Sequence, residues 1–330
     1  MKLRPTFGRI ERTRFHGSFG VFDRVFRPRF EHRLRRVLRD HQVKLIHTIP
    51  LTYDIVPVTR VAAQLKIPYF LNIQDDIVCA AFGGHVLMGQ KVAALSNAWR
   101  NAKGVFVISD EIGQEYSRRY GVREYQIVTD GLTSVAKAPK SRPDRSLRVY
   151  FMGIFHNSYR ANLRALLDAL KIIRSQHPDW DISVTCRSHS IYCPLEPDDV
   201  PVKVLPFAPD ESVVDVDMLA ADLLYQPMPF EEYAANFGRF SMSTKMVTYL
   251  GSGLPILYHG PEDAAACKLL TSHHAAAVCT TLDAQTIAKQ LTEAVSNRES
   301  IVNHALQLAR TRFMLADQQR RFWQPLIAAL

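Results

Sequence analysis

The sequence lacks the features of a membrane-spanning, secreted or disulfide-rich protein. None of its apolar runs approaches the ~20 residues that a membrane-spanning helix needs, and residues 1–14 contain no apolar segment like that of a secretory signal. Only five of the 330 residues are cysteines. Because these are odd in number and widely scattered, they favour buried or half-buried free thiols in a reducing compartment. We therefore expect a cytoplasmic protein.

A metal centre is not indicated either. Cys186 and Cys193 flank His189, but their spacing does not match that of a zinc knuckle. We expect no metal and no cofactor.

The sequence does contain abundant apolar residues arranged in short runs. Hydrophobic residues make up 47% of the chain, which predicts a folded protein of a length that suits two domains. Short apolar runs that read as strands alternate with stretches that read as helices. The runs are residues 43–47, 67–73, 104–109 and 125–129 in the first half, and 147–152, 182–187, 202–205, 223–227 and 256–258 in the second. This alternation predicts an α/β protein with doubly wound parallel sheets, in which ligands bind at the carboxyl ends of the strands.

Positive charge is concentrated in residues 1–44, a segment that we call the basic arm. The arm holds 13 Lys/Arg and 4 Asp/Glu, a difference of +9, which equals the net charge of the whole chain. Its apolar residues predict two helical faces separated by Pro28: Phe19, Phe22, Val25 and Phe26, then Phe30, Leu34, Val37 and Leu38.

Three interpretations of the basic arm stay open. It is a domain helix with an arginine-rich solvated face, or a surface that contacts anionic lipid headgroups, or a nucleic-acid contact. The arm lacks the interleaved aromatic and glycine pattern of an RNA-binding sheet, so we expect no nucleic-acid partner. Contact with the inner face of a membrane remains an expectation.

A segment from Phe240 to Gly260 predicts a helix, a tight turn and a buried strand. Ser243 or Thr244 is placed to cap the helix, and Lys245 lies in its first turn, where a cation is unfavourable unless an anion faces it. A second turn, after the predicted strand 147–152, contains Gly153 and precedes a long helix. Both places favour phosphate, although a surface lysine on a core helix is the alternative for Lys245.

These residues resemble motifs of glycosyltransferase family 4. The match comprises Ser243-Thr244-Lys245, Tyr249-Leu250 and Gly253-Leu254-Pro255-Ile256, together with Leu45-Ile46-His47, Ile67-Pro68 to Asp76, and Val107-Ile108-Ser109. The resemblance extends over most of the chain from about Val43 onward. It implies a GT-B fold, in which two Rossmann-like domains face a cleft: an acceptor-side domain at 1–140, a donor domain at 147–310, and a C-terminal helix at 311–330 that returns to the first domain.

The resemblance also implies an activity. It is that of a retaining, metal-independent glycosyltransferase that moves a sugar from a nucleotide-diphosphate donor to a glycan or lipid-linked acceptor. The implied donor-binding residues are Gly153, Arg160, Ser243, Lys245 and Thr248; those on the acceptor side are His47 and Gln74; the implied catalytic pair is Asp75 and Asp76. The two aspartates are equally well explained as loop and cap residues, and His47 as a core histidine.

Three departures from the family pattern favour an alternative function. About 40 residues precede Leu45, without a clear strand–Gly loop–helix unit, so the first domain is expected to be shortened. Ile154 and Phe155 replace the basic residue that follows the glycine. Thr248 and Phe240 stand where the family carries its Glu-x7-Glu pair. The alternative is a GT-B-fold protein with weak or no transferase activity that acts as a partner or regulatory subunit.

Overall fold

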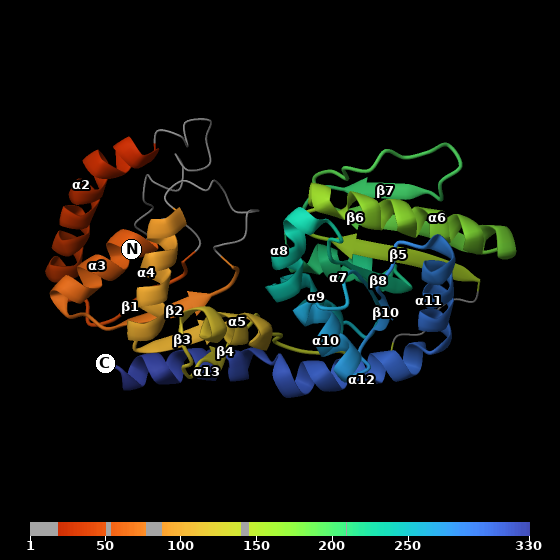
Figure 1. The fold of residues 1–330 in the computed structure, drawn as a ribbon. Helices are drawn as coiled ribbons and strands as arrows, with labels where there is room; N and C mark the ends of the chain where they lie inside the picture. Colours follow the sequence, from red (N-terminus) through yellow and green to blue (C-terminus); the bar gives the residue numbers. More distant parts are fainter. Residues whose placement is uncertain (1–18, 51–53, 77–87, 140–144, 209) are drawn as a thin grey trace. The chain divides into compact units, whose positions relative to one another are not determined.

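The computed structural model describes residues 19–50, 54–76, 88–139, 145–208 and 210–330 (Figure 1). The chain divides into two compact units. Unit 1 comprises Met1–Thr129 and Gln318–Leu330, and unit 2 comprises Asp130–Asp317. Cys79 and residues 140–144 lie outside the described residues.

Unit 1 is built on a parallel sheet whose four described strands follow in chain order, β1-β2-β3-β4. The strands are β1 (Ile46–Thr48), β2 (Tyr69–Ile73), β3 (Gly104–Val107) and β4 (Gln126–Ile127), each inside or overlapping a run predicted from the sequence. The accompanying helices are α2 (Phe19–Asp40), α3 (Ile55–Leu65), α4 (Met88–Asn101), α5 (Asp110–Tyr120) and α13 (Leu315–Ala328). This alternation follows the expected βα pattern.

Two apolar clusters hold helices against unit 1. One joins Leu34 and Leu38 of α2 to Val61 of α3. The other joins Phe70, Phe106 and Val128 to Leu326 of α13. The last helix therefore packs on side chains of the sheet although it is far from them in sequence.

The basic arm does not form two helices separated by Pro28. Pro28 lies inside the single helix α2. A proline inside a helix removes one backbone hydrogen bond, and here the apolar face that packs Leu34 and Leu38 against α3 outweighs that loss.

The C-terminal helix expected at 311–330 is interrupted near its start. α12 (Arg298–Arg312) ends before Phe313, and α13 begins at Leu315. Between them the chain pairs with Leu132, whose N–H donates to the Phe313 carbonyl at 2.7 Å and whose carbonyl accepts from Leu315 N–H at 2.9 Å. Trp323 of α13 is 54% exposed.

Unit 2 contains a parallel six-stranded sheet in the order β10-β9-β8-β5-β6-β7. The strands are β5 (Ser146–Met152), β6 (Asp181–Arg187), β7 (Val202–Leu205), β8 (Leu223–Pro227), β9 (Ile256–His259) and β10 (Ala277–Cys279). Later strands are added on one side of β5 and then on the other, so the order reverses between β5 and β8. That reversal is a topological switch point, where sheets of this kind bind ligands.

Helices cover both faces of the unit 2 sheet. One face packs against α6 (Arg160–Gln176) and α11 (Ala284–Ser296), and the other against α9 (Thr244–Leu250), α10 (Ala265–Ser272) and α12. The remaining helices are η3 (Asn157–Tyr159), α7 (Glu211–Leu219), η4 (Glu232–Ala234) and α8 (Ala235–Phe240). Four cysteines (Cys186, Cys193, Cys267 and Cys279) are buried and free, as predicted.

No described helix combines the length and apolar character needed to cross a bilayer.

Asn162, near the start of α6, ties together the carboxyl ends of two strands. Its side chain is fully buried, and Nδ2 donates to the Met228 carbonyl at 2.9 Å and to the His259 carbonyl at 3.0 Å. Each bond satisfies a carbonyl just at or after the end of β8 or β9.

We expect Asn162→Ala to lower the free energy of unfolding by about 2–4 kcal/mol, because two buried carbonyls lose their side-chain donor. Urea denaturation measures this change. Asn157→Ala is the control, because Asn157 is exposed and its loss should change stability by less than about 0.5 kcal/mol. Equal effects of the two substitutions would contradict the assigned role of Asn162.

Candidate functional site

Gly153 and Lys245 meet at the switch point of the unit 2 sheet. Gly153 directly follows β5 and has a φ of +106°, a backbone conformation that favours glycine. A Cβ placed on Gly153 would lie 3.3 Å from Lys245 Cε. The absence of a side chain on Gly153 therefore gives Lys245 room to reach the end of β5.

The Lys245 ammonium lies over two aromatic rings. Its Nζ is 4.7 Å from the centroid of the Phe151 ring and 5.4 Å from that of Tyr159. Ring faces attract cations, but burial disfavours charge and lowers the pKa of Lys245 to about 8. Among the described residues, no carboxylate lies within ion-pair distance of this ammonium.

His156 extends the site and was not identified from the sequence. Its ring meets Tyr159 at a centroid distance of 5.7 Å and Phe237 of α8 at 6.0 Å. Partial burial lowers the pKa of His156, and the nearby positive charge of Lys245 lowers it further. In the sequence, His156 belongs to a run of ring-bearing residues that follows Gly153. Its contact with Phe237 of α8 depends on the fold and could not be read from that run.

The other predicted donor-side residues are less closely connected. Ser243 occupies the N-cap of α9 but makes no side-chain capping hydrogen bond, so the capping prediction is wrong for Ser243. Thr248 is half-buried in the same helix. Arg160 is exposed at the start of α6, and the contacts recorded for the described residues do not join it to Lys245.

The predicted acceptor-side residues lie in unit 1, and two of them have clear structural contacts. The Asp76 carboxylate is buried, accepts from Arg119 Nη1 at 2.9 and 3.1 Å, and accepts from the Tyr116 hydroxyl at 3.3 Å. This pairing gives Asp76 a structural role. Gln74 donates from Nε2 to Asn72 Oδ1 at 2.5 Å.

Asp75 and His47 differ in their surroundings. Asp75 is half-buried just after β2. His47 lies within β1, and its ring meets Phe322 edge-on at 5.0 Å and Phe106 at 6.5 Å. Burial lowers the pKa of His47.

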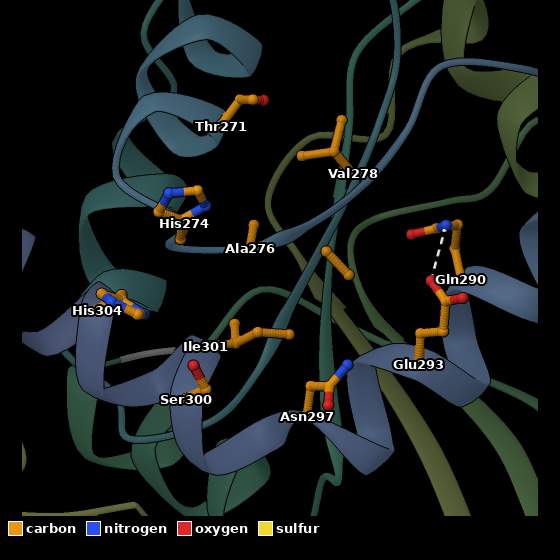
Figure 2. Close-up of a pocket in the computed structure, with 11 residues that line it drawn as sticks. Thr271, His274, Ala276, Val278, Gln290, Glu293, Asn297, Ser300, Ile301 and His304 are labelled. Atoms are coloured by element: carbon orange, nitrogen blue, oxygen red, sulfur yellow. Dashed lines mark hydrogen bonds between the residues drawn. The ribbon is translucent and has the colours of Figure 1, made fainter.

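A separate cavity in unit 2 contrasts with the Lys245 site (Figure 2). It has a volume of about 580 Å³ and lies beside β10, with His274, His304, Asn297 and Glu293 among its lining residues. Gln290 donates to Glu293 Oε2 at 3.0 Å across one wall. Because no Lys or Arg is among its recorded lining residues, it does not offer the cation that a phosphate needs.

The two units share the architecture of solved GT-B proteins. The structure of Anabaena Alr3699/HepE in complex with UDP and glucose is similar at a TM-score of 0.65 and 15% identity, with 90% of this chain and 81% of that chain covered. A trehalose-phosphate synthase from Burkholderia vietnamiensis is similar at a TM-score of 0.65 and 14% identity, with 93% of this chain and 80% of that chain covered. The corresponding enzyme from Burkholderia xenovorans is similar at a TM-score of 0.65 and 13% identity, with 99% of this chain and 83% of that chain covered. At these identities the similarity shows the fold, and the predicted GT-B fold class is confirmed.

A sequence comparison adds a family match for part of the chain. Residues 6–129 match the model of a glycosyl transferase 4-like domain. The chain thus has the GT-B fold, and its residues 6–129 are similar to a glycosyl transferase 4-like domain, in line with the predicted resemblance. No curated protein matches the sequence.

We expect Lys245→Met to raise the free energy of unfolding of the ligand-free protein at pH 7 by about 2 kcal/mol, allowing for partial exposure. The lowered pKa means that the charged form is less favourable in the folded chain than in the unfolded chain. For the same reason, the wild-type stability should rise as the pH increases from about 8 to 10.5.

Denaturant titration at several pH values measures both effects. Lys268→Met, at an exposed position of α10, is the control and should leave stability nearly unchanged. A destabilised Lys245→Met protein would show that the ring contacts of Lys245 outweigh its desolvation.

Proposed function

We propose that the chain is a retaining glycosyltransferase that takes its sugar from a nucleotide-diphosphate donor without needing a metal ion. The observation that carries the proposal is the Lys245 ammonium, held partly buried beside Gly153 without a carboxylate among its recorded partners. A cation in such surroundings gains most from an anionic ligand. The diphosphate of a nucleotide-sugar supplies that charge.

The proposed chemistry is electrostatic. As the bond between the sugar and the diphosphate of the donor breaks, negative charge grows on the departing diphosphate. A fixed cation stabilises that charge. Lys245 has this role, with Arg160 at the start of α6 as a second cation. Gly153 lets the backbone after β5 approach the ligand, Ser243 and Thr248 offer hydroxyls along α9, and His156 lines the same turn. Since Alr3699/HepE was solved with UDP, we take UDP as the nucleotide to test.

The acceptor is proposed to be a glycan or a lipid-linked saccharide that reaches unit 1. Gln74, Asp75 and His47 are the acceptor-side residues of the proposal, with Asp75 as the base that orients a hydroxyl. On α2, Val25 and Phe26 are 48% and 42% exposed, and Arg29 and Arg33 are exposed beside them. Exposed apolar and cationic side chains on one helix support peripheral contact with an anionic lipid surface at the inner face of a membrane.

The alternative is a GT-B-fold partner or regulatory subunit with little transfer activity. Thr248 favours it, because a neutral hydroxyl stands where the family has a glutamate to accept hydrogen bonds from the ribose. Loss of a charged acceptor weakens such binding by about 1.5–3 kcal/mol.

We expect UDP to bind the wild-type chain in a titration calorimeter and Lys245→Met to weaken binding at least about tenfold at pH 7, equivalent to about 1.4 kcal/mol. The affinity should fall as the pH rises through about 8, since neutral Lys245 no longer attracts the diphosphate. Binding near pH 8.5 should take up a proton, because the bound anion raises the pKa of the lysine.

Lys268→Met is again the control and should bind UDP with the wild-type affinity and pH dependence. Proton uptake is read from titrations in buffers of different ionisation enthalpy. If the chain binds neither UDP nor other nucleoside diphosphates, the transferase proposal fails and the partner function is favoured.

A further inference from the structure

We propose that a groove between α3 and α4 of unit 1 binds an acidic polysaccharide, which is the acceptor or product chain of the transfer. The identification of the bound chain as acceptor or product rests on the proposed function. Its binding to the groove does not depend on catalysis. The groove is made by two helices that pack against each other on unit 1 (Figure 1).

The groove consists of two adjoining cavities. Their volumes are about 660 and 490 Å³, and Thr59, Ala63 and Asn97 line both, so the two cavities are direct neighbours. Ala63 faces Ala93 and Ala94 across the first cavity, and these small side chains leave the space between the helices open. An 11-residue helix such as α3 is roughly 16 Å long, so the groove suits an extended chain rather than a single small molecule.

Both ends of the groove are cationic. Arg27 and Arg60 line one end, and Lys66 and Lys103 line the other. Among the described residues that line the two cavities, none is an aspartate or glutamate. Arg60 pairs with Glu31 at 3.1 Å, but Glu31 is buried and not part of the lining. A chain with repeated negative charges therefore meets a cation at each end and no opposing carboxylate in the lining.

The walls between these ends carry carboxamides. Gln64, Gln90, Asn97 and Asn101 line the groove and are exposed, and Asn101 Nδ2 donates to Asn97 Oδ1 at 2.9 Å. A carboxamide offers a donor and an acceptor side by side, which matches neighbouring hydroxyl groups on a sugar ring. Acidic sugars combine such hydroxyls with negative charge.

The same lining disfavours other polyanions. Its one aromatic residue, Tyr69, is buried, so the groove has no exposed ring on which the bases of RNA stack. A lipid bilayer is too flat to enter a space between two packed helices.

The course of the groove connects it to the proposed acceptor residues. Val56 and Gln90 mark one end; they lie at the starts of α3 and α4, the helices that follow the carboxyl ends of β1 and β2. Gln74 and Asp75 lie at that same edge of the sheet. Lys66, Tyr69 and Lys103 mark the other end, where β2 and β3 begin. A bound chain thus extends from the acceptor edge to the opposite edge of unit 1.

Binding of a defined-length oligogalacturonate to the full chain, measured by titration calorimetry, tests the proposal. We expect Lys66→Glu with Lys103→Glu to weaken binding at least about tenfold, since each exposed charge contributes up to about 1 kcal/mol. Ala93→Trp, which fills the groove without changing its charge, should weaken binding to a similar degree. The matched control is Lys203→Glu with Lys268→Glu, two exposed lysines of unit 2, which should keep the wild-type affinity.

Three further ligands separate the alternatives. Neutral dextran and poly-L-glutamate should bind much more weakly than oligogalacturonate, and equal binding of polyglutamate would replace the saccharide with an acidic peptide and overturn the proposal. Groove substitutions that weaken binding to phosphatidylglycerol vesicles but not to oligogalacturonate would overturn it in favour of a membrane surface. Lys245→Met should keep wild-type oligogalacturonate binding, so failure of the donor site and failure of the groove are distinguishable.

Discussion

The proposed donor-side site depends on one unfavourable placement: a lysine ammonium that is partly withdrawn from water and held over aromatic rings. Lys245 reaches that place because Gly153 has no side chain and because Phe151 and Tyr159 present their ring faces. Burial disfavours the charged form, which lowers the pKa of Lys245 to about 8. A group that weakens the free protein and strengthens an anionic complex is typical of binding sites.

The surroundings of Lys245 are fixed by buried polar contacts at the ends of the strands. Asn162 binds the carbonyls of Met228 and His259, and the Ser188 hydroxyl accepts from Phe155 N–H at 3.1 Å. These bonds attach the turn after β5 to β6, β8 and β9. Loops held in this way keep a constant geometry while their exposed atoms stay available to a ligand.

Unit 1 uses its charges differently. Asp76 and Arg119 are 43 positions apart in the sequence yet form a bidentate pair, and Glu115 adds a second carboxylate to the same guanidinium. That network is structural, because it satisfies a buried carboxylate. In the groove between α3 and α4, by contrast, the described lining contains no carboxylate, and Arg60 pairs with Glu31 outside that lining.

Much of the fold was determined by local sequence. Every described strand except β10 overlaps a predicted apolar run, because run length and side-chain periodicity act over a few residues. The family motifs likewise identified Gly153 and Lys245. Local rules failed where distant contacts outweighed them: packing against α3 keeps α2 continuous through Pro28, and pairing with Leu132 divides the predicted last helix at Phe313 and Met314. The order of the strands, the rings beneath Lys245, the pairing of Asp76 with Arg119 and the alanine-lined groove were decided only by the tertiary structure. Each of these depends on which residues far apart in the chain are buried together, and that information is not contained in any short segment.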